Sequence, residues 1–399
     1  MTGGHDDVPG RAAGGRRYAL VAGGGTAGHL QPALAIAEAL VELGHDRDTI
    51  EFVGSERGQD ASALAGRGFP VTLLPGRGIV RSFAPRDLVR NARSAYELAV
   101  AAVRAVTVVG RARPRVVVAV GGYASVAGAV GALVHRVPLV LVNVDAVPGA
   151  ANRLLGRFAK ASAVGWEGTR LPRAAVTGTP VRPAISAVVR TPAARDAARA
   201  ELGMPEDRQV IVVFGGSLGA RQINRAVDGL ADRWDGRGDV AIYHIVGRRD
   251  WGTYAGDDGA ERLTHTGPGP DGLDLVRVPY EERMPLVYAA ADLVVCRAGA
   301  MTVAELAVAG VPAVLVPLPG APGDHQTANA QVLARVGAAV LLPDPECTPT
   351  GLGKVVEELL VDPDHLAAMG RAAKRVGRPD AALAGARVVE ANARPGATA

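Results

Sequence analysis

Three runs of branched apolar residues in this 399-residue chain stop at paired glycines. The glycines that follow these runs are Gly23-Gly24-Gly25, Gly121-Gly122 and Gly215-Gly216. Each pattern predicts a buried parallel strand whose carboxyl end opens into a glycine turn and then a helix. Glycine lets a backbone approach a ligand closely, and the N–H groups of a helix N-terminus attract anions. Three such loops, in two separate halves of the chain, predict a two-domain α/β protein that holds a phosphate-bearing ligand.

Composition narrows the class of protein. The formal net charge of +4 is small for this length, which argues against a dedicated nucleic-acid binder. Two cysteines, Cys296 and Cys347, offer neither a disulfide framework nor the ligand spacing of a zinc site. No apolar run reaches the roughly 20 residues of a spanning helix, and residues 1–16 lack the apolar stretch of a signal peptide. We therefore expect a cytoplasmic protein. Contact with a membrane from the cytoplasmic side is compatible with this expectation.

Short apolar strands alternate with amphipathic helical stretches along the chain, which predicts parallel sheets with right-handed crossovers. The predicted strands are Tyr18–Ala22, Ile50–Val53, Val71–Leu74, Val116–Val120, Leu139–Val142, Val210–Phe214, Val240–Val246, Leu275–Val278, Leu293–Val295 and Ala313–Pro317. Ligands of such sheets bind beyond the carboxyl ends of the strands, where strand order reverses. All three glycine loops are expected there.

A proline-flanked segment, Gly178–Pro183, is the predicted domain boundary. The expected division is a disordered tail at 1–16, an N-terminal Rossmann-like domain at 17–182, a C-terminal one at 183–375, and a helix and tail at 376–399. An alternative is that the helix after about residue 363 returns to the first domain.

The first loop satisfies the G-x-G-x-x-G pattern of dinucleotide sites through Gly23, Gly25 and Gly28. Such a site also needs an acidic residue at the end of the second strand, but Glu56 comes later than expected. A dinucleotide site is therefore disfavoured. His29 follows the loop near a helix start, where it is either a helix-capping or surface histidine, or a general base that takes a proton near neutral pH.

Several longer stretches make a resemblance specific. They are GGGTAGHLQPALAIAEAL from Gly23, GGYAS at 121–125, GTPVR at 178–182, FGGSLGARQIN at 214–224, ADLVVCRAGAMTVAELAVAGVPAVLVPLP at 291–319 and DHQTANA at 324–330. In this order, from residue 18 to about 375, they resemble the bacterial glycosyltransferases that make lipid II, the undecaprenyl-diphospho-muramoylpentapeptide N-acetylglucosaminyltransferases. The resemblance implies a GT-B fold of two Rossmann-like domains and UDP-N-acetylglucosamine as the donor substrate.

The resemblance also assigns the donor side. It places Arg182, Gly215, Gly216, Ser217 and Gly219 near the diphosphate, Glu305 on the ribose hydroxyls, and Gln326 and Asn329 at or near the sugar. Helix-terminal N–H groups and a guanidinium neutralise a leaving diphosphate without a metal, and no Asp-x-Asp motif ends a strand, so no metal ion is required. The alternatives are simple turn geometry for the glycines, an ion pair with Arg297 for Glu305, and loop caps for Asp324 and His325.

The acceptor side is where this chain departs from the family. The resemblance assigns Thr26, Ala27, Gly28 and Gly121–Gly122 to the acceptor, with His29 taking the proton of the attacking hydroxyl in an inverting transfer. The family's His-Glu-x-Asn stretch is here Val142-Asn143-Val144-Asp145, with a matching Asn152. Valine cannot donate a hydrogen bond or carry a proton. Two interpretations stay open: Asn143 and Asp145 serve the same lipid acceptor differently, or the chain is a paralogue with another acceptor, such as a specialised metabolite.

Residues 76–113 combine arginines with apolar side chains, a pattern that suits an anionic membrane surface as well as an ordinary solvated helix. The basic members are Arg77, Arg81, Arg86, Arg90, Arg93, Arg104, Arg111 and Arg113, and the apolar ones are Ile79, Val80, Phe83, Leu88 and Val89. The resemblance favours a peripheral protein at the cytoplasmic face of the membrane, with a prenyl-diphosphate lipid as acceptor. Two rival functions remain: a UDP-N-acetylglucosamine 2-epimerase, and an inactive UDP-sugar-binding scaffold.

Overall fold

The computed structural model describes residues 16–24, 27–56, 64–75, 85–216, 218–255, 260–266 and 272–395. Thr26, Ser217 and the side chain of Ala27 lie outside the described residues. Most of the predicted membrane-facing segment does so as well, because residues 76–84 and the side chains of residues 85–95 are not described. The chain forms two compact units, 1–142 with 154–162 and 386–399, and 143–153 with 163–385.

The first sheet has seven strands in the order β3-β2-β1-β4-β5-β6-β7. They are β1 (Ala19–Gly23), β2 (Ile50–Ser55), β3 (Val71–Leu74), β4 (Val116–Gly121), β5 (Leu139–Asn143), β6 (Ala161–Val164) and β7 (Ala174–Val176). Strand β1 pairs in parallel with both β2 and β4, so the order reverses between β1 and β4. The first two glycine loops follow these two strands, as predicted.

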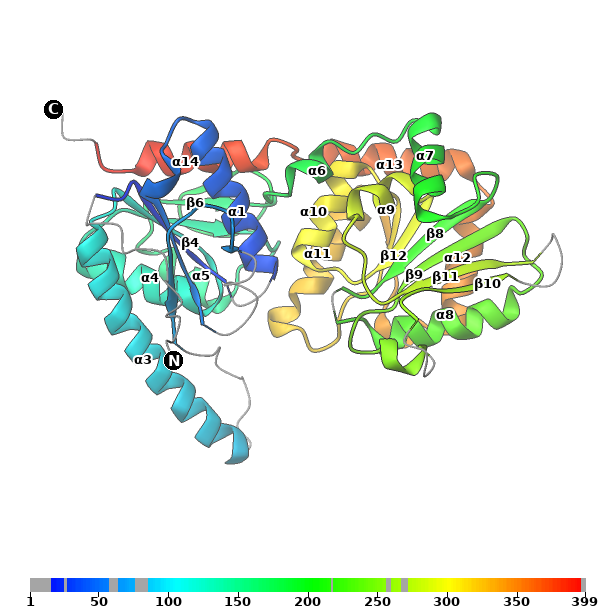
Figure 1. Cartoon of the computed structure of the whole chain (residues 1–399), viewed down its shortest axis with the longest axis horizontal. Helices are drawn as coiled ribbons and strands as arrows, with labels where there is room; N and C mark the ends of the chain where they lie inside the picture. The colour runs from blue at the N-terminus through cyan, green and yellow to red at the C-terminus, as the bar shows by residue number, and fades with distance from the viewer. Residues whose placement is uncertain are drawn as a thin grey trace, which may run out of the picture. The chain divides into compact units, whose positions relative to one another are not determined.

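Helices cover this first sheet in Figure 1. They are α1 (Ala27–Glu42), α3 (Pro85–Ala112), α4 (Gly122–Val134), α5 (Ala150–Leu155) and α14 (Ala381–Asn392), with a 3₁₀ turn at Arg47–Thr49. Helix α4 packs closely along α3, and a core of alanine, valine and leucine side chains from β1, β4 and β5 lies beneath them.

The second sheet has the order β10-β11-β9-β8-β12-β13-β14. Its strands are β8 (Gln209–Phe214), β9 (Val240–Ile245), β10 (Leu263–Thr266), β11 (Asp274–Val278), β12 (Leu293–Cys296), β13 (Ala313–Leu315) and β14 (Ala339–Leu341). Strand order reverses between β8 and β12, and the third glycine loop follows β8. The expectation of purely parallel sheets is wrong at one edge, because β10 pairs antiparallel with β11.

Both faces of this second sheet are covered by helices (Figure 1). They are α6 (Pro183–Ser186), α7 (Pro192–Leu202), α8 (Arg221–Arg233), α9 (Met284–Ala290), α10 (Ala300–Ala309), α11 (His325–Ala334), α12 (Pro349–Leu360) and α13 (Pro363–Val376), with 3₁₀ turns at Trp251–Thr253, Pro322–Asp324 and Asp344–Glu346. Alternate residues of β8 explain the two layers. Val210, Val212 and Phe214 join one apolar core, whereas Ile211 and Val213 join the other, so a continuous apolar run serves both faces.

The two units divide the chain differently from the predicted boundary at Pro183. Residues 163–182 group with the second unit, where Trp166 and Val181 pack in its core. Helix α13 also belongs to the second unit, and the chain rejoins the first unit from residue 386. The segment 143–153, which holds Asn143, Asp145 and Asn152, lies in the second unit as well.

Candidate functional site

His29 is held in place by the second glycine pair of the first unit. It lies in the first turn of α1, and a Cβ on Gly121 would come within 2.4 Å of its Cδ2 atom. A Cβ on Gly122 would come within 2.4 Å of the carbonyl oxygen of Gly24. Both glycines have positive φ, 129° and 76°. The loops after β1 and β4 can therefore pack against each other, with the imidazole between them, only if these residues are glycines.

The loop after β8 packs just as tightly against the end of β9 in the second unit. Gly219 has φ 82°, and a Cβ there would lie 2.2 Å from the carbonyl oxygen of Val246. A Cβ on Gly215 would lie 2.3 Å from the backbone nitrogen of Ala220, whereas Gly216, with φ 94°, faces open space. Ala220 is the N-cap of α8 and supplies no side-chain cap. The first N–H groups of α8 therefore lack a capping side chain, which is the arrangement that suits a bound phosphate.

A buried polar network joins the end of β9 to the first turn of α8, next to this loop. His244 is fully buried, and its Nε2 lies 3.0 Å from Oδ1 of Asn224, whose Nδ2 donates to the Val246 carbonyl and to Asp250. Arg249 and Arg221 both pair with the Asp250 carboxylate. Because an amide oxygen only accepts, His244 donates through Nε2 as a neutral imidazole. Burial lowers the pKa of His244 to about 3, so the network does not titrate near neutral pH.

Glu305 is a nearly buried carboxylate on α10, and Oε2 accepts a hydrogen bond of 2.8 Å from the hydroxyl of Tyr288 on α9. Its other oxygen, Oε1, lies 3.9 Å from a guanidinium nitrogen of Arg182. Burial raises the pKa of Glu305 above its usual value, although Tyr288 and Arg182 partly counter the shift. The alternative partner is wrong, because Arg297 instead pairs with Asp344 and the carbonyl oxygens of Val316 and Pro317.

The residues predicted to recognise the sugar lie on α11. Gln326 uses Oε1 to accept from the backbone N–H of Leu318 at 3.0 Å. Asn329 is fully buried; it accepts from the N–H of Ala146 at 2.8 Å and donates to Asp145 Oδ1 at 2.9 Å and to the Ala298 carbonyl. Asn329 therefore links α11 to the altered acceptor motif within the second unit.

The altered motif is itself a hydrogen-bonded unit. Asn143 donates to the carbonyl of Asp145 at 2.6 Å and accepts from Nδ2 of Asn152 at 3.0 Å. The indole of Trp166 and the hydroxyl of Thr179 both donate to the Val144 carbonyl. The resemblance motifs identified these positions, but nothing in the sequence indicated that they bond to one another and to Asn329.

Two loop-cap predictions have mixed outcomes. Asp324 occupies the N-cap position of α11 with φ 53°, but its carboxylate accepts from the Thr327 hydroxyl rather than from a backbone N–H. His325 Nδ1 bonds to the Pro322 carbonyl at 2.9 Å, so it stabilises the turn before the helix.

Within the described residues, no group of three or more histidine, cysteine, aspartate or glutamate side chains is placed to hold a metal ion. Among the helices that the structure describes, none combines the length and apolar character needed to cross a membrane.

Two mainly parallel Rossmann-like sheets, each reversing its strand order beside a glycine loop, are typical of the GT-B class of glycosyltransferase fold. The chain belongs to glycosyltransferase family 28: residues 19–164 match its N-terminal domain and residues 210–383 its C-terminal domain. This membership makes the protein a hexosyltransferase and confirms the resemblance drawn from the sequence.

Relatives that align with this chain over nearly their whole length share one enzyme name. The UDP-N-acetylglucosamine–N-acetylmuramyl-(pentapeptide) pyrophosphoryl-undecaprenol N-acetylglucosamine transferase of Desulforudis audaxviator is 36% identical over 91% of this chain and 95% of its own length. The enzyme of the same name from a Nocardioides strain is 40% identical over 93% of this chain and 96% of its own length. The crystal structure of MurG from Acinetobacter baumannii is similar with a TM-score of 0.73 and 26% identity, covering 94% of this chain and all of that one.

Proposed function

We propose that the protein transfers N-acetylglucosamine from UDP-N-acetylglucosamine to lipid I, the undecaprenyl-diphospho-N-acetylmuramoyl pentapeptide, and so forms lipid II for peptidoglycan. The observation that carries the proposal is the name shared by relatives that align over nine-tenths of the chain. The buried Glu305 and the uncapped N-terminus of α8, both in the second unit, support a nucleotide-sugar site there.

The donor would bind on the second unit. The N–H groups at the start of α8 and the loop of Gly215, Gly216, Ser217 and Gly219 would hold the diphosphate, and the Arg182 guanidinium would offset its charge. Glu305 would accept from the ribose hydroxyls with the oxygen that Tyr288 leaves available. Gln326 would contact the sugar, whereas Asn329 would act by positioning Asp145.

The transfer would proceed with inversion and without a bound metal. A hydroxyl of the acceptor attacks the anomeric carbon, the bond from that carbon to the diphosphate oxygen breaks, and UDP leaves with both electrons. His29 would take the proton of the attacking hydroxyl as the new glycosidic bond forms. Thr26, Ala27 and Gly28 would line the acceptor side, and Asn143, Asp145 and Asn152 would replace the family's His-Glu-x-Asn stretch there.

A lipid acceptor requires the protein to work at the cytoplasmic face of the membrane as a peripheral protein. The arginines and apolar residues between 76 and 113 would supply the anionic-surface contact. Binding to vesicles of phosphatidylglycerol, compared with phosphatidylcholine, tests this point; equal binding to both would remove it.

Radiolabelled transfer from UDP-N-acetylglucosamine tests the acceptor. We expect label on a lipid I analogue and none on soluble aglycones. Label only on a soluble aglycone would favour the paralogue alternative, and donor binding without any transfer would favour the scaffold. Epimer formed from the donor alone would indicate an epimerase instead.

A further inference from the structure

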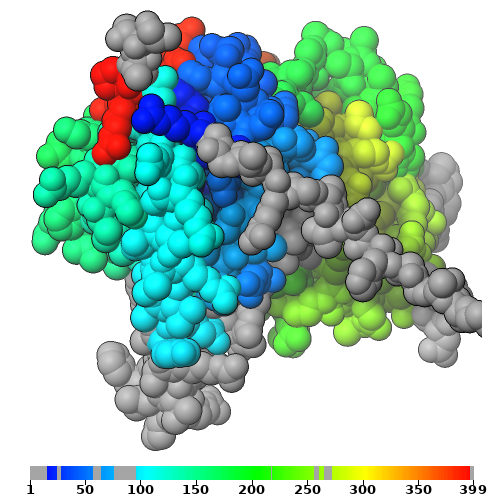
Figure 2. All heavy atoms as spheres, turned by 60° about the vertical axis from the view of Figure 1, so that its left-hand side comes forward, coloured from blue at the N-terminus to red at the C-terminus, as the bar shows by residue number. Residues whose placement is uncertain are grey.

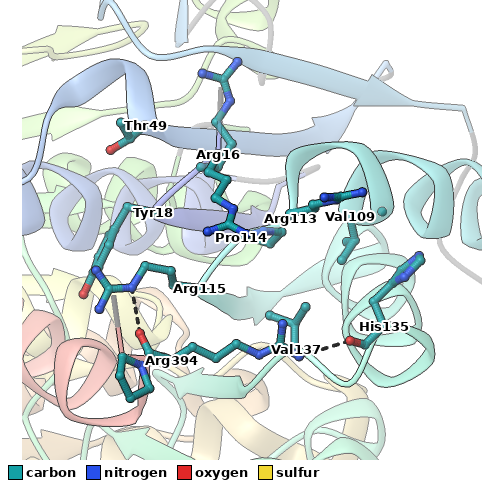
Figure 3. Close-up of a pocket in the computed structure, with 13 residues that line it drawn as sticks. Arg16, Tyr18, Thr49, Val109, Arg113, Pro114, Arg115, His135, Val137 and Arg394 are labelled. Atoms are coloured by element: carbon teal, nitrogen blue, oxygen red, sulfur yellow. Dashed lines mark hydrogen bonds between the residues drawn. The ribbon is translucent and has the colours of Figure 1, made fainter. Parts of the chain in front are cut away.

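A strongly basic pocket lies in the first unit, at the end of the sheet opposite the glycine loops (Figure 3). Its volume is about 740 Å³. Its walls come from segments that immediately precede strands: Tyr18 before β1, Thr49 before β2, Arg115 before β4 and Val137 before β5. The glycine loops follow the carboxyl ends of β1 and β4, so this pocket is separate from the predicted acceptor site.

The lining is rich in cations. The six basic residues that line it are Arg16, Arg17, Arg113, Arg115, His135 and Arg394, and among the described residues that line it there is no aspartate or glutamate. Two neighbouring acids are engaged elsewhere, because Glu51 pairs with Arg17 and Glu390 with His45. Asp48, which precedes Thr49, is exposed and accepts from Arg17 only through its backbone carbonyl. The pocket therefore holds several guanidinium groups whose charge no lining carboxylate neutralises.

Contacts with the rest of the first unit give a structural function to only some of these arginines. Arg115 Nε donates to the Arg394 carbonyl at 2.7 Å, and its guanidinium lies over the ring of Tyr18. Arg394 donates to the carbonyl of His135 just after α4 (Figure 3) and to that of Arg136. These contacts hold residues 394 and 395 against the start of β4. Figure 2 shows the red C-terminal residues beside the first described residues, in dark blue, and the cyan α3.

Arg16 and Arg113 have no such structural function. Within the described part of the chain, neither side chain makes a hydrogen bond or an ion pair. Both residues are exposed, and Arg113 has φ 44°, in the left-handed region. Two arginines without a partner among the described residues, beside three that are fixed by packing, leave guanidinium N–H groups available to a ligand.

We propose that this pocket binds an anion that carries two or more phosphate groups. Guanidinium forks match phosphate oxygens bidentately, and several that line one concavity suit a compact, multiply charged ligand. A peptide partner would need apolar anchors, but the apolar side chains of the lining include Val109 and Val137, which are both buried. The same phosphate chemistry occurs in soluble polyphosphates or nucleotides and in an anionic phospholipid surface, and the experiment separates these sources.

The test uses the full-length protein with UDP at saturation, so that the donor site is occupied. Calorimetry with tripolyphosphate measures the soluble source, and co-sedimentation with phosphatidylglycerol vesicles measures the lipid source. The variant is Arg16→Gln with Arg113→Gln, which removes two charges without breaking a described contact. The control is Arg67→Gln with Arg387→Gln, two exposed arginines of the same unit that lie outside the pocket lining.

We expect at least one probe to bind, with an affinity that the pocket variant lowers tenfold or more and the control variant leaves within twofold. Binding should also weaken at 0.5 M salt, because the contacts are exposed charge pairs. Tripolyphosphate binding that the pocket variant weakens would identify a soluble ligand. Binding of vesicles alone, weakened by the pocket variant and not by the control, would identify an anionic lipid surface whose neighbouring headgroups supply one phosphate each. Absence of binding to both probes, or equal losses in the two variants, would overturn the proposal.

Discussion

Tyr288 gives the sharpest test of the donor site, because its hydroxyl is the one described side-chain donor within hydrogen-bond distance of the Glu305 carboxylate. Tyr288 is fully buried, and the bond to Oε2 is 2.8 Å long. Tyr288→Phe removes one oxygen and leaves the ring in place. A hydrogen bond to a charged group contributes about 1.5–3 kcal/mol, and 1.4 kcal/mol corresponds to tenfold in affinity. If loss of this hydrogen bond leaves the Glu305 carboxylate misoriented toward the ribose, the affinity for UDP should fall by about tenfold, and by on the order of 100-fold at most.

Calorimetry with UDP and 2′,3′-dideoxy-UDP isolates the ribose contact. The unaltered protein should prefer UDP, and Tyr288→Phe should narrow that preference because the misplaced carboxylate no longer meets the hydroxyls. Tyr243→Phe is the matched control: this buried tyrosine of the same unit donates to Glu281 at 2.7 Å. An unchanged preference in Tyr288→Phe, or an equal loss in Tyr243→Phe, would refute the role of Glu305.

Three further predictions follow from the same geometry. Burial raises the pKa of Glu305 in the folded protein, so its ionised form opposes folding above pH 4.5. Glu305→Gln should therefore raise the urea midpoint of unfolding at pH 8 and not at pH 4, and it should weaken UDP binding. A lower midpoint at pH 8 would contradict this. The pKa of His244 is about 3 in the folded protein and 6.5 in the unfolded chain, so its contribution to stability is present above pH 6.5 and falls by about 2 kcal/mol at pH 5. His244→Asn should lack this part of the pH dependence in urea unfolding. An identical dependence of stability on pH in the variant would refute the prediction. Gly121→Ala should displace the His29 ring and lower kcat at least tenfold, with UDP affinity unchanged. Gly44 also has a positive φ, 97°, but open space around it, so Gly44→Ala should strain the backbone and leave kcat unchanged. Equal effects of the two variants on kcat would show that the contact of Gly121 with His29 is not the cause.

The fold was largely predictable, because long runs of branched residues mark strands buried on both faces. Each of the ten predicted strands corresponds to a strand of the structure, and Val71–Leu74 has the same bounds. The missed strands are short: β7 and β14 have three residues, and β6 and β10 have four. Segments of this length carry little periodicity. Strands β3, β12 and β13 are equally short, but longer apolar runs or the family motifs marked them in the sequence. Strand β10 is also the antiparallel edge, which no βαβ alternation predicts.

The sequence indicates a candidate site residue where one residue is anomalous in its local context. Glu305 stands out as a carboxylate in an apolar helix, and the family motifs supplied Arg182, Gln326 and Asn329. Tyr288 was missed because it lies 17 residues earlier on a different helix and meets Glu305 only in the folded unit. The contact of Asn329 with Asp145 spans 184 residues for the same reason. Such partners depend on tertiary packing, which local sequence patterns do not report.

The central claim is that His29 acts on the acceptor while the second unit holds the donor. Steady-state transfer of radiolabelled N-acetylglucosamine to a lipid I analogue, measured for His29→Ala beside the calorimetric affinity for UDP, tests it most directly. The account predicts a fall in kcat of at least 100-fold, since a general base contributes about 10² to 10⁴, with UDP affinity unchanged. Turnover equal to that of the unaltered protein, or a parallel loss of UDP affinity, would contradict it.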